Sequence, residues 1–93
     1  MAIQSFACKH TRALFEGQRV RRWISIETIA MRKLAMLNVA VALDDLRIPP
    51  ANRLEALQGD RRGQHSIRIN DQFRVCFVWT ANGPANVEIV DYH

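Results

Sequence analysis

Apolar residues recur at two different periods along this chain, and the change of period divides it into a helical half and a strand half. After residue 25 they recur at every third or fourth position, the spacing of one face of an α-helix. Ser25 can cap this helix, and Pro49-Pro50 must end it, because the residue before a proline avoids the helical conformation. The predicted core-facing stripe consists of Ile26, Ile29, Ala30, Leu34, Leu37 and Val41, widened by Met36, Leu43 and Leu46.

Shorter elements are predicted before this long helix. Ile3 to Phe6 is an apolar stretch with room for an edge strand. Thr11 to Glu16 reads as a brief helix, and Gly17 suits the left-handed position that follows a helix end. Gln18 to Trp23 is basic, so we expect it to be exposed.

Beyond residue 64 the period falls to two, which indicates strands. His65 to Ile69 and Phe73 to Trp79 alternate, and Asn70-Asp71 lies between them as a hairpin turn. Asn82-Gly83-Pro84 predicts a second turn before Val87 to Asp91. Helices first and a meander of antiparallel strands afterwards predict an α+β fold, formed by residues 1–93 as one domain.

The same alternation sorts the side chains of the last two strands by face. It places Asp91 on the face opposite Tyr92, and His93 can rejoin the Asp91 side. Arg74 lies in the middle of the predicted hairpin, where an unpaired buried charge would be costly. Two interpretations of Arg74 remain open: an ion pair with Asp91 or Glu88, or a phosphate clamp at the mouth of the sheet.

Composition narrows the class of protein. A chain of 93 residues, 48% of them hydrophobic, can bury one core and is too apolar to be disordered. No apolar stretch approaches the ~20 residues that span a bilayer, and residues 1–6 lack a signal-peptide pattern. We therefore expect a cytoplasmic protein without membrane contact and with Cys8 and Cys76 reduced. Cys8-Lys9-His10 lacks two further ligands for a metal, so no metal or other cofactor is expected.

Arginine dominates the charge of the chain. Thirteen basic and nine acidic residues give a net charge of +4, and eleven of the thirteen are arginine. A GC-rich genome also favours arginine codons, but the arginines are clustered. One group is Arg19, Arg21 and Arg22, and the other is Arg53, Arg61, Arg62, Arg68 and Arg74. Because guanidinium groups bind phosphate bidentately, a polyanionic partner is favoured over a neutral metabolite.

The segment Asp91-Tyr92-His93 is the strongest candidate for a site. It follows an apolar strand directly and combines an acid, a phenol and an imidazole, which can transfer protons near neutral pH.

A set of motifs occurs in order along nearly the whole chain. They are Arg22-Trp23, Arg32-Lys33-Leu34, Asn52-Arg53-Leu54-Glu55, Leu57 with Gly59-Asp60-Arg61, Gly63 through Gln72, Phe73-Arg74-Val75-Cys76-Phe77 and Asp91-Tyr92-His93. In this ordered set the chain resembles the HigB-type toxins of bacterial toxin–antitoxin pairs, within the RelE superfamily.

The resemblance implies a RelE-like fold, with two helices packed on a small antiparallel sheet formed mainly by the C-terminal half. It implies a ribosome-dependent endoribonuclease that cleaves mRNA in the decoding site. The implied partners are a helix-turn-helix antitoxin of the HigA type, the ribosome and mRNA. Operator DNA would be contacted only through the antitoxin.

The resemblance also suggests roles for individual residues. His93 would act as general base or acid, Asp91 would orient it, and Arg74 would stabilise the phosphate. Tyr92 would donate a hydrogen bond or stack on a base. Further residues expected to bind RNA are Arg53, Gln58, Arg61, Arg62, His65 and Arg68.

The chain departs from the family pattern at two positions. Some members have lysine where this chain has Gln58 and histidine where it has Glu55. Either Arg61 or Arg62 would then supply the charge, or cleavage would be slow. Glu55 could serve as a base, but a carboxylate of this kind is more often a solvated surface group.

Two other functional classes therefore stay open. One is a non-catalytic ribosome-binding or RNA-binding protein of the same fold, and the other, more remote, is a metabolic enzyme using Cys8 or Cys76. Trp23, beside Arg21 and Arg22, is expected at an interface with ribosomal RNA or the antitoxin.

Overall fold

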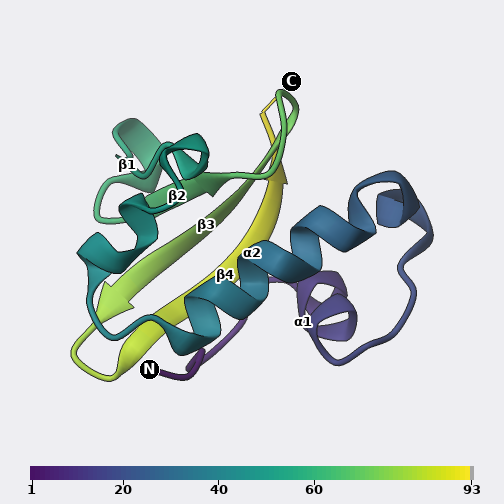
Figure 1. Cartoon of the computed structure of the whole chain (residues 1–93), viewed down its shortest axis with the longest axis horizontal. Helices are drawn as coiled ribbons and strands as arrows, with labels where there is room; N and C mark the ends of the chain where they lie inside the picture. The colour runs from purple at the N-terminus through teal and green to yellow at the C-terminus, as the bar shows by residue number, and fades with distance from the viewer. Residues whose placement is uncertain (93) are drawn as a thin grey trace.

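The computed structural model describes residues 1–92 and has two helices packed on a four-stranded antiparallel sheet. Helix α2 crosses one face of this sheet, and α1 lies beside the N-terminal half of α2 (Figure 1). The sheet has the order β1-β2-β3-β4 and comes from the C-terminal half, so the predicted α+β fold is confirmed. The elements are α1 Lys9–Phe15, α2 Glu27–Val39, β1 Glu55–Ala56, β2 His65–Arg68, β3 Phe73–Thr80 and β4 Gly83–Asp91.

The core lies between α2 and the sheet. Ala30, Leu34 and Leu37 of α2 are buried against one face of β3, where they meet the buried side chains of Val75 and Phe77. Full burial of each large apolar side chain contributes roughly 1.5–3 kcal/mol to the stability of the folded protein. This packing fixes which face of β3 is turned away from the helices.

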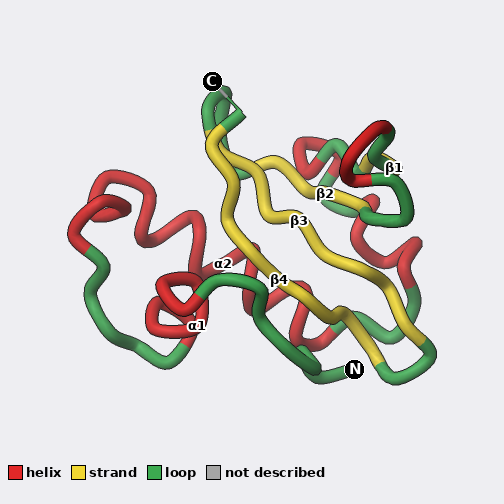
Figure 2. The backbone as a smooth tube through the Cα atoms, turned by 180° about the vertical axis from the view of Figure 1, so that it is seen from behind, coloured by secondary structure: helices red, strands yellow, loops and turns green. Residues whose placement is uncertain are grey.

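Helix α1 and the N-terminal segment complete the structure at the β4 side of the sheet. The buried hydroxyl of Thr11 accepts a hydrogen bond of 3.0 Å from the Ile89 amide. Gly17 ends α1 with φ of +93°, the left-handed conformation that its position predicts. The predicted edge strand at residues 3–6 is reduced to a single parallel bridge between Phe6 and Val87, and this segment runs beside β4 in Figure 2.

The turn between β2 and β3 sets the register of the sheet. The Asn70 side-chain oxygen accepts hydrogen bonds from the amides of Gln72 (2.9 Å) and Phe73 (2.7 Å), so Asn70 closes the turn locally. The resulting antiparallel register pairs Arg68 with Arg74 and brings Ser66 opposite Cys76.

The long helix ends earlier than the apolar pattern predicts. Helix α2 stops at Val39, Ala40 is extended, and Leu43–Arg47 forms a separate 3-10 turn, η2. Asp45 explains the break, because its carboxylate accepts 3.0 Å hydrogen bonds from the amides of Val41 and Ala42. The prediction that Val41 and Ile29 face the core is therefore wrong: both are exposed.

Two further expectations about the start of α2 are also wrong. Ser25 makes no capping hydrogen bond; Ile26 holds the N-cap position, and a 3-10 turn, η1 (Arg21–Ile26), leads into the helix. Trp23 is buried in the core, so it is not a free surface for RNA or an antitoxin. Its neighbour Arg22 lies over the Trp23 ring, 5.5 Å from its centroid.

The difference between core and exposed positions of α2 can be tested by urea unfolding. Leu34→Ala should lower the free energy of unfolding by about 2–5 kcal/mol, because it leaves a cavity between α2 and the sheet. Ile29→Ala on the same helix should change it by less than about 1 kcal/mol, since Ile29 is 39% exposed. Equal losses for the two variants would contradict the helix orientation described here.

Candidate active site

The guanidinium of Arg74 is held in one orientation on the sheet face that points away from α2. Its Nε donates to the Ser66 hydroxyl (2.7 Å) and its Nη2 donates to the Arg53 carbonyl (2.7 Å). The carboxylate of Glu55 lies 3.3 Å from the same Nη2. The side chain of Arg74 is only 11% exposed, so these polar contacts compensate for the loss of water around its charge.

Strand pairing explains why these groups meet. Ser66 of β2 lies opposite Cys76, and Glu55 of β1 lies opposite Ser66, so Glu55, Ser66 and Arg74 share a face. Arg53 precedes β1 and has left-handed backbone angles, φ 46° and ψ 57°, and its carbonyl accepts the bond from Arg74. The ion pair predicted for Arg74 is therefore made with Glu55 rather than with Asp91 or Glu88.

Tyr92 lies beside Arg74 on the same face. The Arg74 guanidinium carbon is 6.0 Å from the centroid of the Tyr92 ring, within the range of a cation–π contact. Although 46% of Tyr92 is exposed, its hydroxyl lies 3.8 Å from the sulfur of the buried Cys76. Burial and this thiol raise the pKa of Tyr92, and the nearby charges of Arg61 and Arg74 oppose the rise. Tyr92 is therefore a neutral hydrogen-bond donor at physiological pH.

An open depression of about 440 Å³ surrounds Arg74 and Tyr92. Three arginines and two acidic residues line it, and Arg68 pairs with Asp71 at its edge. Its lining residues are Arg53, Glu55, Arg68, Asn70, Asp71, Arg74 and Tyr92. Concave shape, three arginines and an exposed aromatic ring together suit a phosphate with an attached nucleoside.

Asp91 lies on the other face of the sheet from Arg74. Alternation along β4 puts it on the Ile89 side, as the sequence predicts, and its carboxylate accepts a 3.1 Å hydrogen bond from the Gln72 side chain. It lines a separate depression of about 320 Å³ together with Arg22 and Trp23. The structure therefore separates Asp91 from Arg74. His93 lies outside the described residues.

The loop between β1 and β2 carries three of the predicted RNA-binding residues. Arg61 donates a 2.7 Å hydrogen bond to Glu88 of β4 and a 3.1 Å bond to Gln64, which ties the loop across the sheet. The hydrogen bond to Glu88 raises the pKa of Arg61, which stays charged. Gln58 and Arg62 are exposed on the same loop, outside the depression around Arg74.

His65 faces the core side of the sheet. Its ring stacks on Phe77 at 6.3 Å, and its buried Nδ1 has no hydrogen-bond partner among residues 1–92. The structure therefore does not bring His65 into the depression around Arg74.

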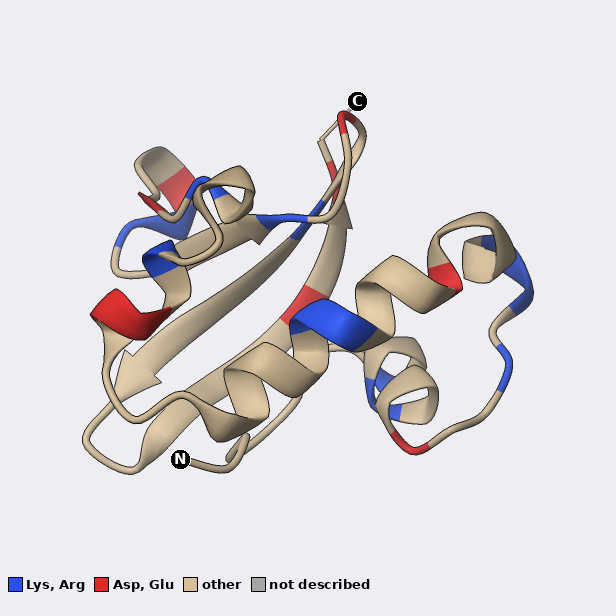
Figure 3. Cartoon of the chain, viewed as in Figure 1, with Lys and Arg blue, Asp and Glu red and all other residues tan. Residues whose placement is uncertain are grey.

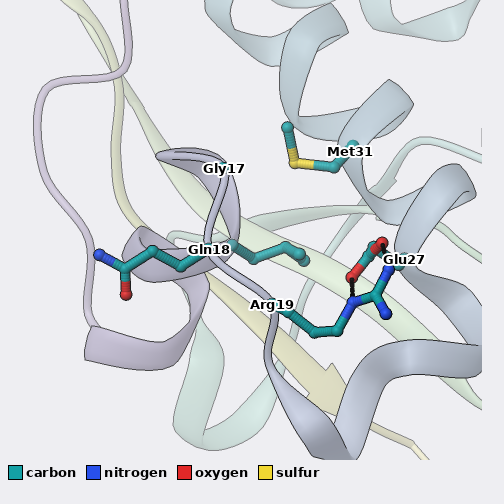
Figure 4. Close-up of a pocket in the computed structure, with 6 residues that line it drawn as sticks. Gly17, Gln18, Arg19, Glu27 and Met31 are labelled. Atoms are coloured by element: carbon teal, nitrogen blue, oxygen red, sulfur yellow. Dashed lines mark hydrogen bonds and ion pairs between the residues drawn. The ribbon is translucent and has the colours of Figure 1, made fainter.

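Another depression, of about 280 Å³, lies between α2 and the loop that follows α1. It contains the ion pair of Arg19 and Glu27, whose charged atoms are 3.4 Å apart, with Met31 above it (Figure 4). None of the residues predicted to act on RNA lines it within the described part of the chain.

Comparison with known proteins decides the family. A family model described as the RelE-like toxin of the type II toxin–antitoxin system HigB matches residues 4–93. A Vibrio cholerae protein named Toxin HigB-1 is 42% identical over 95 aligned positions, which cover 100% of this chain and 98% of that protein. The chain belongs to the HigB-like toxin family. An uncharacterized Haemophilus influenzae protein is 37% identical over 59 positions, 63% of this chain and 58% of that protein.

Two polar residues of the toxin's site were missed at the sequence level. Ser66 is buried and bonds Arg74, and Asn70 lines the depression. The length of the turn decides the face of Ser66. Residues 70–72 separate Ile69 from Phe73, so residue 68 pairs with residue 74 and Ser66 lies on the Arg74 face, whereas a two-residue turn at Asn70-Asp71 would put it on the other face. Glu55 was considered as a base, but its contact with Arg74 depends on β1, a strand of two residues that the apolar pattern does not reveal.

The thiol of Cys76 is not suited to act as a nucleophile. Cys76 is buried, and burial raises the pKa of its thiol, so little thiolate exists near neutral pH. No group of histidine, cysteine or acidic residues suited to holding a metal occurs within residues 1–92.

Tyr92 is the single tyrosine of the toxin, so its ionisation can be followed by ultraviolet absorbance. The folded toxin should titrate above the ordinary value of ~10, because burial beside Cys76 disfavours the phenolate. Arg74→Gln should move the midpoint higher still, since it removes a positive charge that favours the phenolate. A folded-state midpoint at or below that of the unfolded chain would contradict the placement of Tyr92.

Proposed function

We propose that this toxin is a ribosome-dependent endoribonuclease that cleaves mRNA in the decoding site. Membership of a type II toxin family supports a toxic activity. One observation supports a catalytic activity: the Arg74 guanidinium is fixed by Ser66 and Arg53, and it lines an open depression together with Tyr92. A donor held in place before the substrate arrives is the arrangement that stabilises developing charge at little reorganisation cost.

The proposed reaction needs three things from the toxin. The ribose 2′-hydroxyl must lose a proton and attack the adjacent phosphorus, while the bond to the 5′-oxygen breaks. Negative charge grows on the non-bridging oxygens, and the leaving 5′-oxygen must gain a proton. Positioning and electrostatic stabilisation provide most of the catalysis in phosphoryl transfer.

Arg74 is proposed to bind the non-bridging oxygens in the transition state. Arg53 lines the same depression and supplies positive charge that the neutral Gln58 cannot; Arg68 also lines it but is paired with Asp71. Arg61 is less suited to this task, because its guanidinium is already bonded to Glu88 and Gln64. Glu55 holds the Arg74 guanidinium and is a weaker candidate for the base.

Proton transfer is assigned to His93, whose imidazole has an ordinary pKa of ~6.5 and can give or take a proton near neutrality. Asp91 is proposed to orient His93, which lies two residues away in sequence. Asp91 is not proposed to contact the phosphate. Tyr92 is proposed to donate a hydrogen bond or to stack on a base beside the scissile phosphate.

The family implies an antitoxin partner, and we assign it to the HigA type. The ribosome and mRNA are the proposed targets, and operator DNA would be reached only through the antitoxin. The setting for such targets is the cytoplasm. No helix within residues 1–92 has the length and hydropathy needed to cross a membrane.

A second function, a ribosome-binding toxin without catalysis, is favoured by one observation. Asp91 and Arg74 lie on opposite faces of the sheet, so the acid and the guanidinium do not act on one atom together. Primer extension on mRNA from cells expressing the toxin alone separates the two functions. Growth arrest with new 5′ ends inside translated codons supports cleavage, and growth arrest without such ends supports simple binding.

Arg74→Gln tests the proposed chemistry with minimal change of shape. The variant keeps a hydrogen-bonding side chain near Ser66 but loses the positive charge, so ribosome-dependent cleavage should fall by at least about tenfold. Arg47→Gln is the matched control, because Arg47 is exposed and pairs with Asp44 on the η2 turn. Cleavage rates from purified toxin and programmed ribosomes, with circular dichroism as a check of folding, provide the measurement. Equal rates for the two folded variants would make Arg74 a purely structural residue.

A further inference from the structure

A buried lysine lies beneath the segment that carries Arg53. Lys33 of α2 is 7% exposed, and its ammonium donates a 2.6 Å hydrogen bond to the side-chain oxygen of Asn52, which is fully buried. Burial, with smaller contributions from Arg32 and Arg68, lowers the pKa of Lys33. Apolar residues in place of a buried charge often leave stability unchanged or higher, so core packing alone does not account for a lysine here.

Asn52 joins three segments through its side chain. Its oxygen accepts the bond from Lys33, and its amide nitrogen donates to the Leu46 carbonyl at 3.0 Å. Asn52 ends the short 3-10 turn η3, Pro50–Asn52, so helix α2, turn η2 and turn η3 are all fixed at this one residue. The position of Asn52 therefore fixes the position of the Arg53 backbone, which follows it directly.

Arg53 follows Asn52 directly and is one of two non-glycine residues with positive φ among residues 1–92. A residue with a Cβ adopts this left-handed conformation only when its surroundings hold it there. The conformation matters for the site, because the Arg53 carbonyl accepts the 2.7 Å bond from Arg74 Nη2. A continuous series of contacts thus runs from Lys33 through Asn52 and the Arg53 backbone to Arg74.

We infer that Lys33 is a positioning residue, which fixes the Arg74 guanidinium through Asn52 and the left-handed Arg53 backbone. The inference concerns the free toxin and holds whether or not RNA is cleaved. Its catalytic consequence rests on the proposed function, in which Arg74 meets the scissile phosphate. Lys33 itself contacts no substrate in this account.

The Arg74 Nε–H group gives a direct readout, because its ¹⁵N–¹H resonance reports the hydrogen bond to Ser66. Lys33→Met keeps most of the length of the side chain but removes the donor to Asn52, so the resonances of Arg74 Nε and the Arg53 amide should shift or broaden. Arg32→Met is the matched control: it removes one positive charge from the neighbouring, exposed position of the same helix. It should leave both resonances in place. A folded Lys33→Met toxin with both signals at their wild-type positions would overturn the inference.

Asn52→Asp is the second variant and keeps the test decisive if Lys33→Met does not fold. It preserves an oxygen for the Lys33 ammonium, adds a negative charge to it, and removes the amide that donates to the Leu46 carbonyl and contacts the Met36 sulfur. The inference predicts an Arg74 Nε signal close to that of the wild type. A displaced Arg74 Nε signal in the folded Asn52→Asp toxin, in which the Lys33 ammonium keeps its acceptor, would overturn the inference.

The catalytic consequence is tested by measuring the cleavage kinetics of the same variants on programmed ribosomes. Lys33→Met should lower kcat about tenfold with KM nearly unchanged, because a misplaced guanidinium loses contacts made in the transition state. A raised KM with unchanged kcat would refute a positioning role in catalysis. A failure of the proposed function can be told apart from a failure of the inference. If the proposed function is wrong, Arg74→Gln leaves cleavage unaltered, but Lys33→Met still shifts the resonances of Arg74 Nε and the Arg53 amide.

Discussion

The hydrogen bonds of the Arg74 guanidinium set the geometry on which the rest of the site depends. They join β3 to Ser66 of β2 and to the carbonyl of Arg53, which precedes β1. The same strand buries Val75 and Phe77 against α2 through its other face. One strand therefore anchors the core and presents the site, and the loss of either function would disturb the other. Figure 2 shows the strands from the side away from α2, where this site lies.

The positive charge of the toxin has several uses. Arginines occupy the loop between α1 and α2 as well as the region around β1 to β3, and the two lysines lie on the helices (Figure 3). Several of them are partnered: Arg19 with Glu27, Arg61 with Glu88 and Arg68 with Asp71. An exposed pair such as Arg19 with Glu27 contributes only ~0–1 kcal/mol to stability, whereas the pair of Arg61 with Glu88 is partly buried. Composition alone thus overstates the number of arginines that are free to meet RNA.

Local pattern predicted the architecture and part of the site. Period-two alternation and the turn at Asn70-Asp71 predicted the hairpin of β2 and β3, and alternation placed Asp91 on the face opposite Tyr92. The register that pairs Arg68 with Arg74 was not predicted. The end of α2 was missed, because Asp45 satisfies backbone amides that a longer helix would have used. The links from Lys33 to Asn52 and from Arg53 to Arg74 were missed for another reason. They join residues 19 and 21 positions apart, and no periodicity encodes such contacts.

The central claim is that RNA meets the toxin on the sheet face that carries Arg74 and Tyr92. The most direct measurement is a structure of the toxin on a ribosome whose mRNA carries a 2′-O-methyl group at the cleavage position, which blocks the attack. The account predicts a phosphate oxygen about 3 Å from the Arg74 guanidinium, with Tyr92 against the adjoining ribose or base. An mRNA path along the α2 side of the toxin, with Arg74 distant from every phosphate, would contradict it.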